Sequence, residues 1–167
     1  MNFSALSDDW VYLLLGTFPE GPPGGALLTL ILSATSGIAS ALLGLVLGIA
    51  LVMSQGWASQ LLHGVLGFLR AIPVLMLIFW IYFLLPMVMG MDVPGTVSVV
   101  CALSLIGGAY LAHGVAAGIR AVPQGQWNAG AALGMNRWQV LRWVVLPQAL
   151  SAMLPSFVNQ WVTLIKD

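Results

Sequence analysis

The side chains that could take part in catalysis are few and widely spaced in this 167-residue chain. The only lysine is Lys166, and residues 162–165 before it contain no glycine, so the chain has no P-loop for nucleotide phosphates. His63 and His113 are 50 residues apart, and neither belongs to the H-E-x-x-H pattern of a zinc protease. The single cysteine, Cys101, excludes an internal disulfide and a cysteine-rich metal site. We therefore expect a protein that is not an enzyme and that binds no metal or cofactor itself.

The composition is that of an integral membrane protein. Hydrophobic residues make up 60% of the chain and charged residues 6%, whereas soluble domains are about one quarter charged. The mean hydropathy is +0.99. The formal net charge is zero, with no basic cluster, so the chain lacks the electrostatic footprint of a nucleic-acid-binding protein. The lipid bilayer is the expected surroundings.

The apolar stretches predict an all-α, polytopic membrane fold with about four spans, because each span needs about 20 apolar residues. We expect these spans at about 26–53, 61–89, 96–116 and 147–166. Pro73 should kink the second span or split it at Ala71-Ile72. Residues 1–25 are expected to form an extracytoplasmic, interfacial segment that is not a cleavable signal, since no basic residue precedes its apolar part.

The arginines set the expected orientation in the membrane. Arg120, Arg137 and Arg142 all lie between the third and fourth spans, so the positive-inside rule places the loop 117–146 in the cytoplasm. Counting back, the loop 54–60 is cytoplasmic, and the turn at 90–95 and the N-terminus are outside.

Small residues recur every four positions in the first span, at Ser36, Ser40, Gly44 and Gly48. This spacing places them on one helix face, where a second backbone can approach closely. This face either packs tightly against another helix or forms a helix interface that slides during transport. Gly114 and Gly118 repeat the pattern at the end of the third span.

Polar side chains inside the spans are candidates for a translocation path, because such residues are costly in a membrane and are usually functional. The candidates are Arg70, His113, Asn159, Gln160, Thr163 and Lys166. The alternatives are that Arg70 reaches the membrane surface, that His113 is a buried, hydrogen-bonded histidine, and that the polar residues of the fourth span bond between helices.

The loop 117–146 predicts two short helices with a fixed bend. Residues 124–133 form the first helix, which Gly134 stops, and Asn136 caps the second helix, 137–146, which Pro147 ends. Such a knob suits docking into a groove on a partner. The alternative is an interfacial helix that lies on lipid, anchored by Trp127, Trp138 and Trp143.

The same loop carries a known pattern. Asn128-Ala129-Gly130 is followed by three residues, Gly134, nine residues and Val144-Val145-Leu146-Pro147. This string resembles the EAA loop of bacterial ABC-importer permeases, and the chain is similar to the polar amino acid permeases, near the glutamate/aspartate branch. Further matching motifs are Arg70-Ala71-Ile72-Pro73, Tyr82, Pro86, Ala109-Tyr110, Gly118-Ile119, Gly125-Gln126, Leu146-Pro147-Gln148-Ala149, Pro155, Asn159 and Lys166-Asp167.

The resemblance implies a permease of the bacterial inner membrane that imports polar amino acids by alternating access. It implies a cytoplasmic ABC ATPase dimer that holds ATP and Mg, a second permease, alike or different, and an extracytoplasmic solute-binding protein. The implied ATPase-coupling residues are Gln124, Gly125, Gln126, Trp127, Asn128, Ala129, Gly130, Ala132, Leu133 and Gly134.

The chain also departs from the family pattern. The family usually has Glu at the position of His113, Arg at Ala116 and Glu at Asn128, which would weaken or retune docking to the ATPase. A fifth helix that follows in the family is missing after Asp167, so we expect a truncated chain. The alternatives are an ABC permease for another small polar solute, or a non-transport or degenerate membrane assembly protein.

Overall fold

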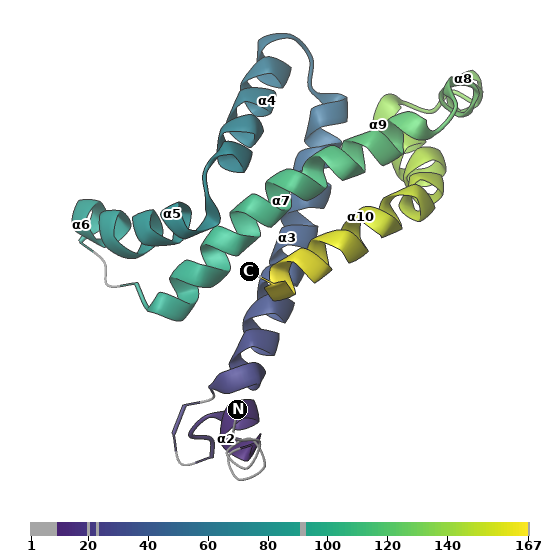
Figure 1. Cartoon of the computed structure of the whole chain (residues 1–167). Coiled ribbons are helices and arrows are strands. Elements are labelled where there is room, and N and C mark those ends of the chain that lie inside the picture. The colour runs from purple at the N-terminus through teal and green to yellow at the C-terminus, as the bar shows by residue number, and fades with distance from the viewer. Residues whose placement is uncertain (1–9, 20, 23, 91–92, 167) are drawn as a thin grey trace.

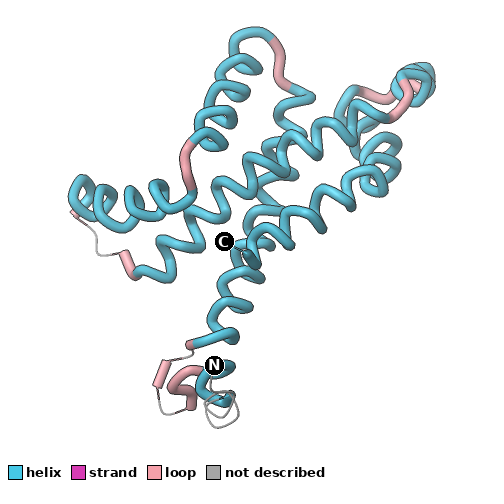
Figure 2. The backbone as a smooth tube through the Cα atoms, in the orientation of Figure 1, coloured by secondary structure: helices cyan, strands magenta, loops and turns pink. Residues whose placement is uncertain are grey.

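The structure is a computed structural model that describes residues 10–19, 21–22, 24–90 and 93–166. These residues form helices and no β-sheet (Figures 1 and 2). The helices are α2 (Trp10–Leu15), α3 (Gly25–Met53), α4 (Gly56–Ala71), α5 (Val74–Phe79), the π-helix η1 (Trp80–Leu84), α6 (Leu85–Met89), α7 (Gly95–Ala121), α8 (Gln124–Ala132), α9 (Arg137–Val140), the π-helix η2 (Leu141–Val145) and α10 (Leu146–Lys166). The first nine residues of the expected interfacial segment lie outside the described residues.

The helices α3 and α7 form the centre of the fold, and α10 packs against both (Figure 1). The small-residue face of α3 makes this contact possible: a Cβ on Gly44 would overlap Leu111, and one on Gly48 would lie 2.5 Å from the Cβ of Val115. The Ser40 hydroxyl donates a hydrogen bond of 3.3 Å to the Leu103 carbonyl. The packing role expected for this face is therefore confirmed.

The chain from α4 to α6 is split in two. α4 ends at Ala71 and α5 begins after Pro73, and the two halves meet at 99°. The break is where the sequence predicts it, and Pro73 causes it because its ring disfavours a helical conformation at Ile72. The stretch 61–89 is therefore two helices rather than one kinked span. Three other helices, Gly25–Met53, Gly95–Ala121 and Arg137–Lys166, are each long and apolar enough to cross a membrane.

Pro147 does not end a helix, contrary to our expectation. α9, η2 and α10 form one helix from Arg137 to Lys166. Its π-turn explains why: the Leu146 N–H bonds to the Leu141 carbonyl, five residues back. The wider turn leaves room for the ring of Pro147, which would clash with a carbonyl in a regular α-helix. η1 precedes Pro86 in the same way.

The third span also extends beyond its expected end, because α7 continues to Ala121. The stretch 117–146 is consequently almost entirely helical, with only residues 122–123 and 133–136 between its helices.

Large apolar side chains cover much of the outer surface. Leu42, Val46 and Phe68 are each about 60% exposed, on α3 and α4. Exposed apolar surface on this scale is stable next to lipid and costly in water.

Candidate functional site: the surface helix α8

The helix α8 stands at one end of the molecule, beyond the end of α7 (Figure 1). Its last turn closes in a Schellman motif: the Met135 N–H donates to the Gly130 carbonyl at 3.2 Å, and the Gly134 N–H donates to the Ala131 carbonyl at 3.0 Å. Gly134 has φ of +78°, which a residue with a Cβ rarely adopts. The helix stop predicted at Gly134 is confirmed.

A capping box starts the next helix immediately after this motif. The Gln139 N–H donates to Asn136 Oδ1 at 2.9 Å, and the Asn136 N–H donates to Gln139 Oε1 at 2.8 Å. The predicted cap by Asn136 is confirmed, and these bonds satisfy two N–H groups that a helix start leaves free. The link between α8 and α9 is therefore well determined by its own hydrogen bonds.

The inner side of α8 is attached to the hydrophobic core. Gly130 is buried, and a Cβ at this position would lie 2.7 Å from Val140 Cγ2. Trp127 is half-buried and packs on the core cluster that includes Val140, Ile119 and Met153. Across the turn, Gln148 Nε2 donates to Gln126 Oε1 at 3.3 Å and joins α8 to α10.

The outer side of α8 is exposed. Leu133 is 82% exposed, and Ala129 and Ala132 are also exposed. Of the ten coupling residues that the resemblance implies, the eight exposed ones are Gln124, Gly125, Gln126, Asn128, Ala129, Ala132, Leu133 and Gly134. Trp127 and Gly130 instead hold the helix in place.

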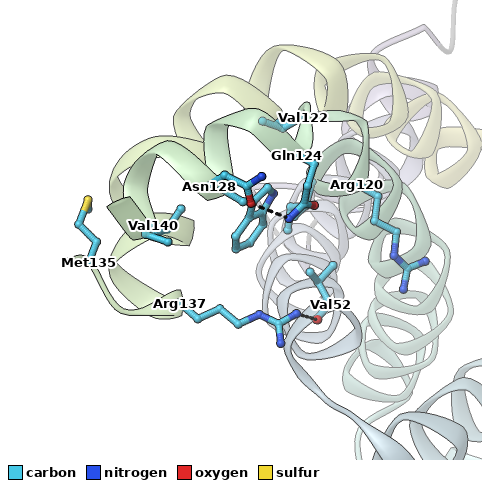
Figure 3. Close-up of a pocket in the computed structure, with 11 residues that line it drawn as sticks. Val52, Arg120, Val122, Gln124, Asn128, Met135, Arg137 and Val140 are labelled. Atoms are coloured by element: carbon cyan, nitrogen blue, oxygen red, sulfur yellow. Dashed lines mark hydrogen bonds between the residues drawn. The ribbon is translucent and has the colours of Figure 1, made fainter. Parts of the chain in front are cut away.

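A pocket of about 510 Å³ lies beneath α8, between its inner face and the ends of α3 and α7 (Figure 3). We call it the α8 pocket. Arg137 Nη2 donates to the Val52 carbonyl at 3.3 Å, near the C-terminus of α3. Gln124 Nε2 donates to Asn128 Oδ1 at 3.5 Å, and Arg120 completes the polar lining. The sequence reasoning did not identify this pocket.

The structure brings together three of the six path candidates. Arg70, Gln160 and Thr163 line a second pocket of about 450 Å³ at the break between α4 and α5. The guanidinium carbon of Arg70 lies 4.7 Å from the centre of the Tyr110 ring, within cation–π distance. Asn159 and Lys166 are exposed and are absent from this lining.

His113 faces a second histidine on α4. The ring centres of His63 and His113 are 6.2 Å apart, at 82° to each other. His113 Nδ1 lies 3.1 Å from the Ala109 carbonyl, and His63 Nδ1 lies 2.8 Å from the Ser59 carbonyl. A carbonyl can only accept a hydrogen bond, so each Nδ1 carries the proton. His113 is therefore half-buried and hydrogen-bonded, outside the pocket of Arg70.

Tyr110 and His63 are partners that the sequence reasoning missed. The helical spacing of these residues could have indicated both partners. Tyr110 and His113 are three residues apart on α7, and His63 and Arg70 are seven residues apart on α4. Each pair therefore shares a helix face. Two polar faces of this kind indicate a contact between the two helices.

The sequence matches the family described as "Binding-protein-dependent transport system inner membrane component" over residues 40–167. It is 33% identical over 149 residues to the glutamate/glutamine/aspartate/asparagine transport system permease protein BztC of Rhodobacter capsulatus, covering 86% of this chain and 34% of that protein. It is 34% identical over 147 residues to the glutamine transport system permease protein GlnP of Escherichia coli K12, covering 86% and 66%. The chain thus spans one third to two thirds of these relatives.

A solved structure shares the fold. A crystal structure of an amino acid ABC transporter with histidines aligns with a TM-score of 0.80 and 26% identity, covering 99% of this chain and 73% of that chain. The family match extends over most of the chain and includes α7, the α8 knob and the broken pair α4–α5. The chain therefore belongs to the binding-protein-dependent transport system inner membrane components and is a multi-pass protein of the inner membrane.

Proposed function

We propose that the chain is a transmembrane permease subunit of an ABC importer for polar amino acids. It forms no bonds and breaks none. A separate pair of cytoplasmic ATPase subunits binds ATP and Mg²⁺, a second permease completes the path, and an extracytoplasmic binding protein delivers the substrate. The permease exposes the path to one side of the membrane and then to the other, as ATPase closure changes the populations of the two states.

The observation that carries this proposal is the arrangement of α8. Its inner side is held by Gly130 and Trp127, and its outer side presents Ala129, Ala132 and Leu133. A short helix with two small residues and one large apolar residue on its free side suits insertion into a groove. Because hydrogen bonds fix the C-terminal end of α8 and join Gln126 to Gln148 of α10, a movement of the helix would be transmitted to α9 and α10.

Two observations support polar amino acids as the substrate. BztC is named for transport of glutamate, glutamine, aspartate and asparagine, and GlnP is named for transport of glutamine. The pocket at the α4–α5 break offers Arg70 for a carboxylate, and Gln160 and Thr163 for amide or amino groups. We therefore place Arg70, Gln160 and Thr163 on the translocation path.

The experiment is uptake of labelled glutamate, glutamine, aspartate and asparagine by cells that express the full-length permease in place of the chromosomal copy. The test variant is Ala132→Arg, which adds a long charged side chain to the free side of α8. We expect uptake to fall at least tenfold, and an ATPase subunit with a P-loop to be lost from the permease purified by affinity tag.

The control variant is Ala58→Arg, an equal change at an exposed position of α4, away from α8. It should keep both uptake and the ATPase subunit. If Ala132→Arg retains the ATPase subunit and normal uptake, α8 is not the coupling element. If none of the four amino acids depends on the permease while the ATPase subunit is recovered, the importer carries another solute.

A further inference from the structure

The α8 pocket uses the side of α8 that faces away from Ala129, Ala132 and Leu133. Gln124, Trp127, Asn128 and Ala131 line it, at the i, i+3, i+4, i+7 spacing of one helix face. The free residues Ala129, Ala132 and Leu133 do not contribute to its lining. A ligand of the pocket would therefore leave these three residues free, and it would contact Gln124 and Asn128, two of the implied coupling residues.

The pocket is basic. Arg120 and Arg137 belong to its lining, and the sequence has no Asp or Glu between residues 93 and 166. Arg137 uses one N–H for the Val52 carbonyl, where its positive charge offsets the partial negative charge at the C-terminus of α3. A guanidinium has five N–H donors, so most of those on the two arginines remain for a ligand. Figure 3 shows Arg137 extending toward the Val52 carbonyl and Arg120 on the other side of the pocket, at the end of α7.

The helix ends and tryptophans around this basic pocket are typical of the level of lipid headgroups. The spanning helices α3 and α7 both end at its wall, at Val52 and Arg120. On the segment that follows Arg137, Trp138 and Trp143 are 59% and 66% exposed, and exposed tryptophans are enriched at the membrane–water interface. The guanidinium of Arg142 lies 5.2 Å from the Trp143 ring centre.

We propose that the α8 pocket binds the phosphate headgroup of an anionic phospholipid of the cytoplasmic leaflet. Arg120 and Arg137 bind the phosphate oxygens, and the side-chain amide of Gln124 binds the glycerol hydroxyls. A pocket of about 510 Å³ is within the range of small-ligand sites, and basic pockets between spanning helices on the cytoplasmic side suit such headgroups. The bound headgroup would brace α8 against α3 and α7.

The inference rests on the membrane orientation in the proposed function but not on transport. Its test is lipid binding by the delipidated permease, purified with its partner subunits, measured by native mass spectrometry. Phosphatidylglycerol and phosphatidylcholine with the same acyl chains are titrated separately. We expect phosphatidylglycerol to bind preferentially, and Arg120→Gln and Arg137→Gln each to weaken its binding about fivefold. Arg142→Gln, which removes an arginine outside the pocket, should leave it unchanged.

Three other results overturn the proposal. Equal binding of the two lipids, or an equal loss with Arg142→Gln, would indicate general attraction to the surface. Displacement of phosphatidylglycerol by inorganic phosphate at equal concentration would assign the site to a free anion. If Arg137→Gln fails to fold because it loses the bond to Val52, Arg120→Gln alone decides. Because no ATPase or uptake enters the readout, a negative result leaves the proposed function standing.

Discussion

At the scale of single residues, Gly130 decides how closely α8 can approach the core. Its backbone lies against the side chain of Val140, so even a methyl group at this position would press on a buried neighbour. The contact is tight because Val140 itself is buried, at 2% exposure, and cannot turn away. The third residue of the EAA-like string, Gly130, is thus a packing requirement as much as a docking feature.

We predict that Gly130→Ala destabilises the permease by about 1–3 kcal/mol, because the added methyl overpacks the contact with Val140. Val140→Ala alone also destabilises, by leaving a cavity. The double variant should recover part of the combined loss, since the small side chain at 140 makes room for the methyl at 130. Denaturant unfolding in detergent of all four proteins measures this coupling.

Gly125→Ala is the matched control, because a Cβ at Gly125 meets nothing within 4 Å. It should leave the free energy of unfolding unchanged or raise it slightly, since alanine favours a helix over glycine. Additive losses at 130 and 140, with no recovery in the double variant, would contradict the packing argument.

The sequence predicted well the roles of residues with a strong preference for one backbone conformation or helix position. Gly134 stops α8 and Asn136 caps α9, because both roles depend on a few neighbouring backbone atoms. The partners of Arg70 and His113 could not be predicted in the same way. Tyr110 and His63 reach them only after α4 has packed against α7, and that contact is a property of the whole fold.

At the scale of elements, the two π-turns show why helix ends were harder to predict than helices. Pro86 and Pro147 each follow a five-residue π-helix and each lie inside a continuing helix. Proline alone suggests a stop, and at these two positions the wider turn before the proline removes the clash. Pro73 has no such turn before it and breaks the chain by 99°. The same residue type therefore has opposite effects in different helical contexts.

The interface between α3 and α7 gives a prediction at this scale. Gly44→Leu should destabilise the protein by about 3 kcal/mol or more, because its side chain would meet the Cβ of Leu111 next to the backbone of α7. The measurement is the yield of folded permease and its thermal unfolding in detergent.

Gly67→Leu, on α4, is the matched control, since a Cβ there meets nothing within 4 Å. It should fold with near-normal yield. Equal tolerance of leucine at 44 and 67 would mean that α3 and α7 do not rely on close backbone approach.

At the scale of the whole molecule, the arginines predict which end lies in the cytoplasm. The basic residues 120, 137 and 142 gather around α8, at the opposite end of α3 from α2 (Figure 1). The positive-inside rule then places the α3–α4 connection inside and the segment around α2 outside.

Cysteine labelling checks this orientation. In a Cys101→Ser background, which removes the only native cysteine, we expect Thr17→Cys to react with a membrane-impermeant maleimide in intact spheroplasts. Ala58→Cys should react only after the membrane is opened. The cysteine-free parent provides the blank, and the reverse pattern of labelling would invert the topology.

The unbroken helix from Arg137 to Lys166 has a mechanical consequence. Thirty residues at 1.5 Å each make a rod about 45 Å long. Its N-terminal end is joined to α8 by the short, hydrogen-bonded link at residues 133–136. Its C-terminal half carries Gln160 and Thr163. A sideways force on α8 would therefore tilt this long helix and move Gln160 and Thr163 in its C-terminal half. Two softer points lie along this helix, the π-turn at Leu141–Val145 and Pro155 inside α10, so the stiffness at both would set how much of the movement of α8 reaches Gln160 and Thr163.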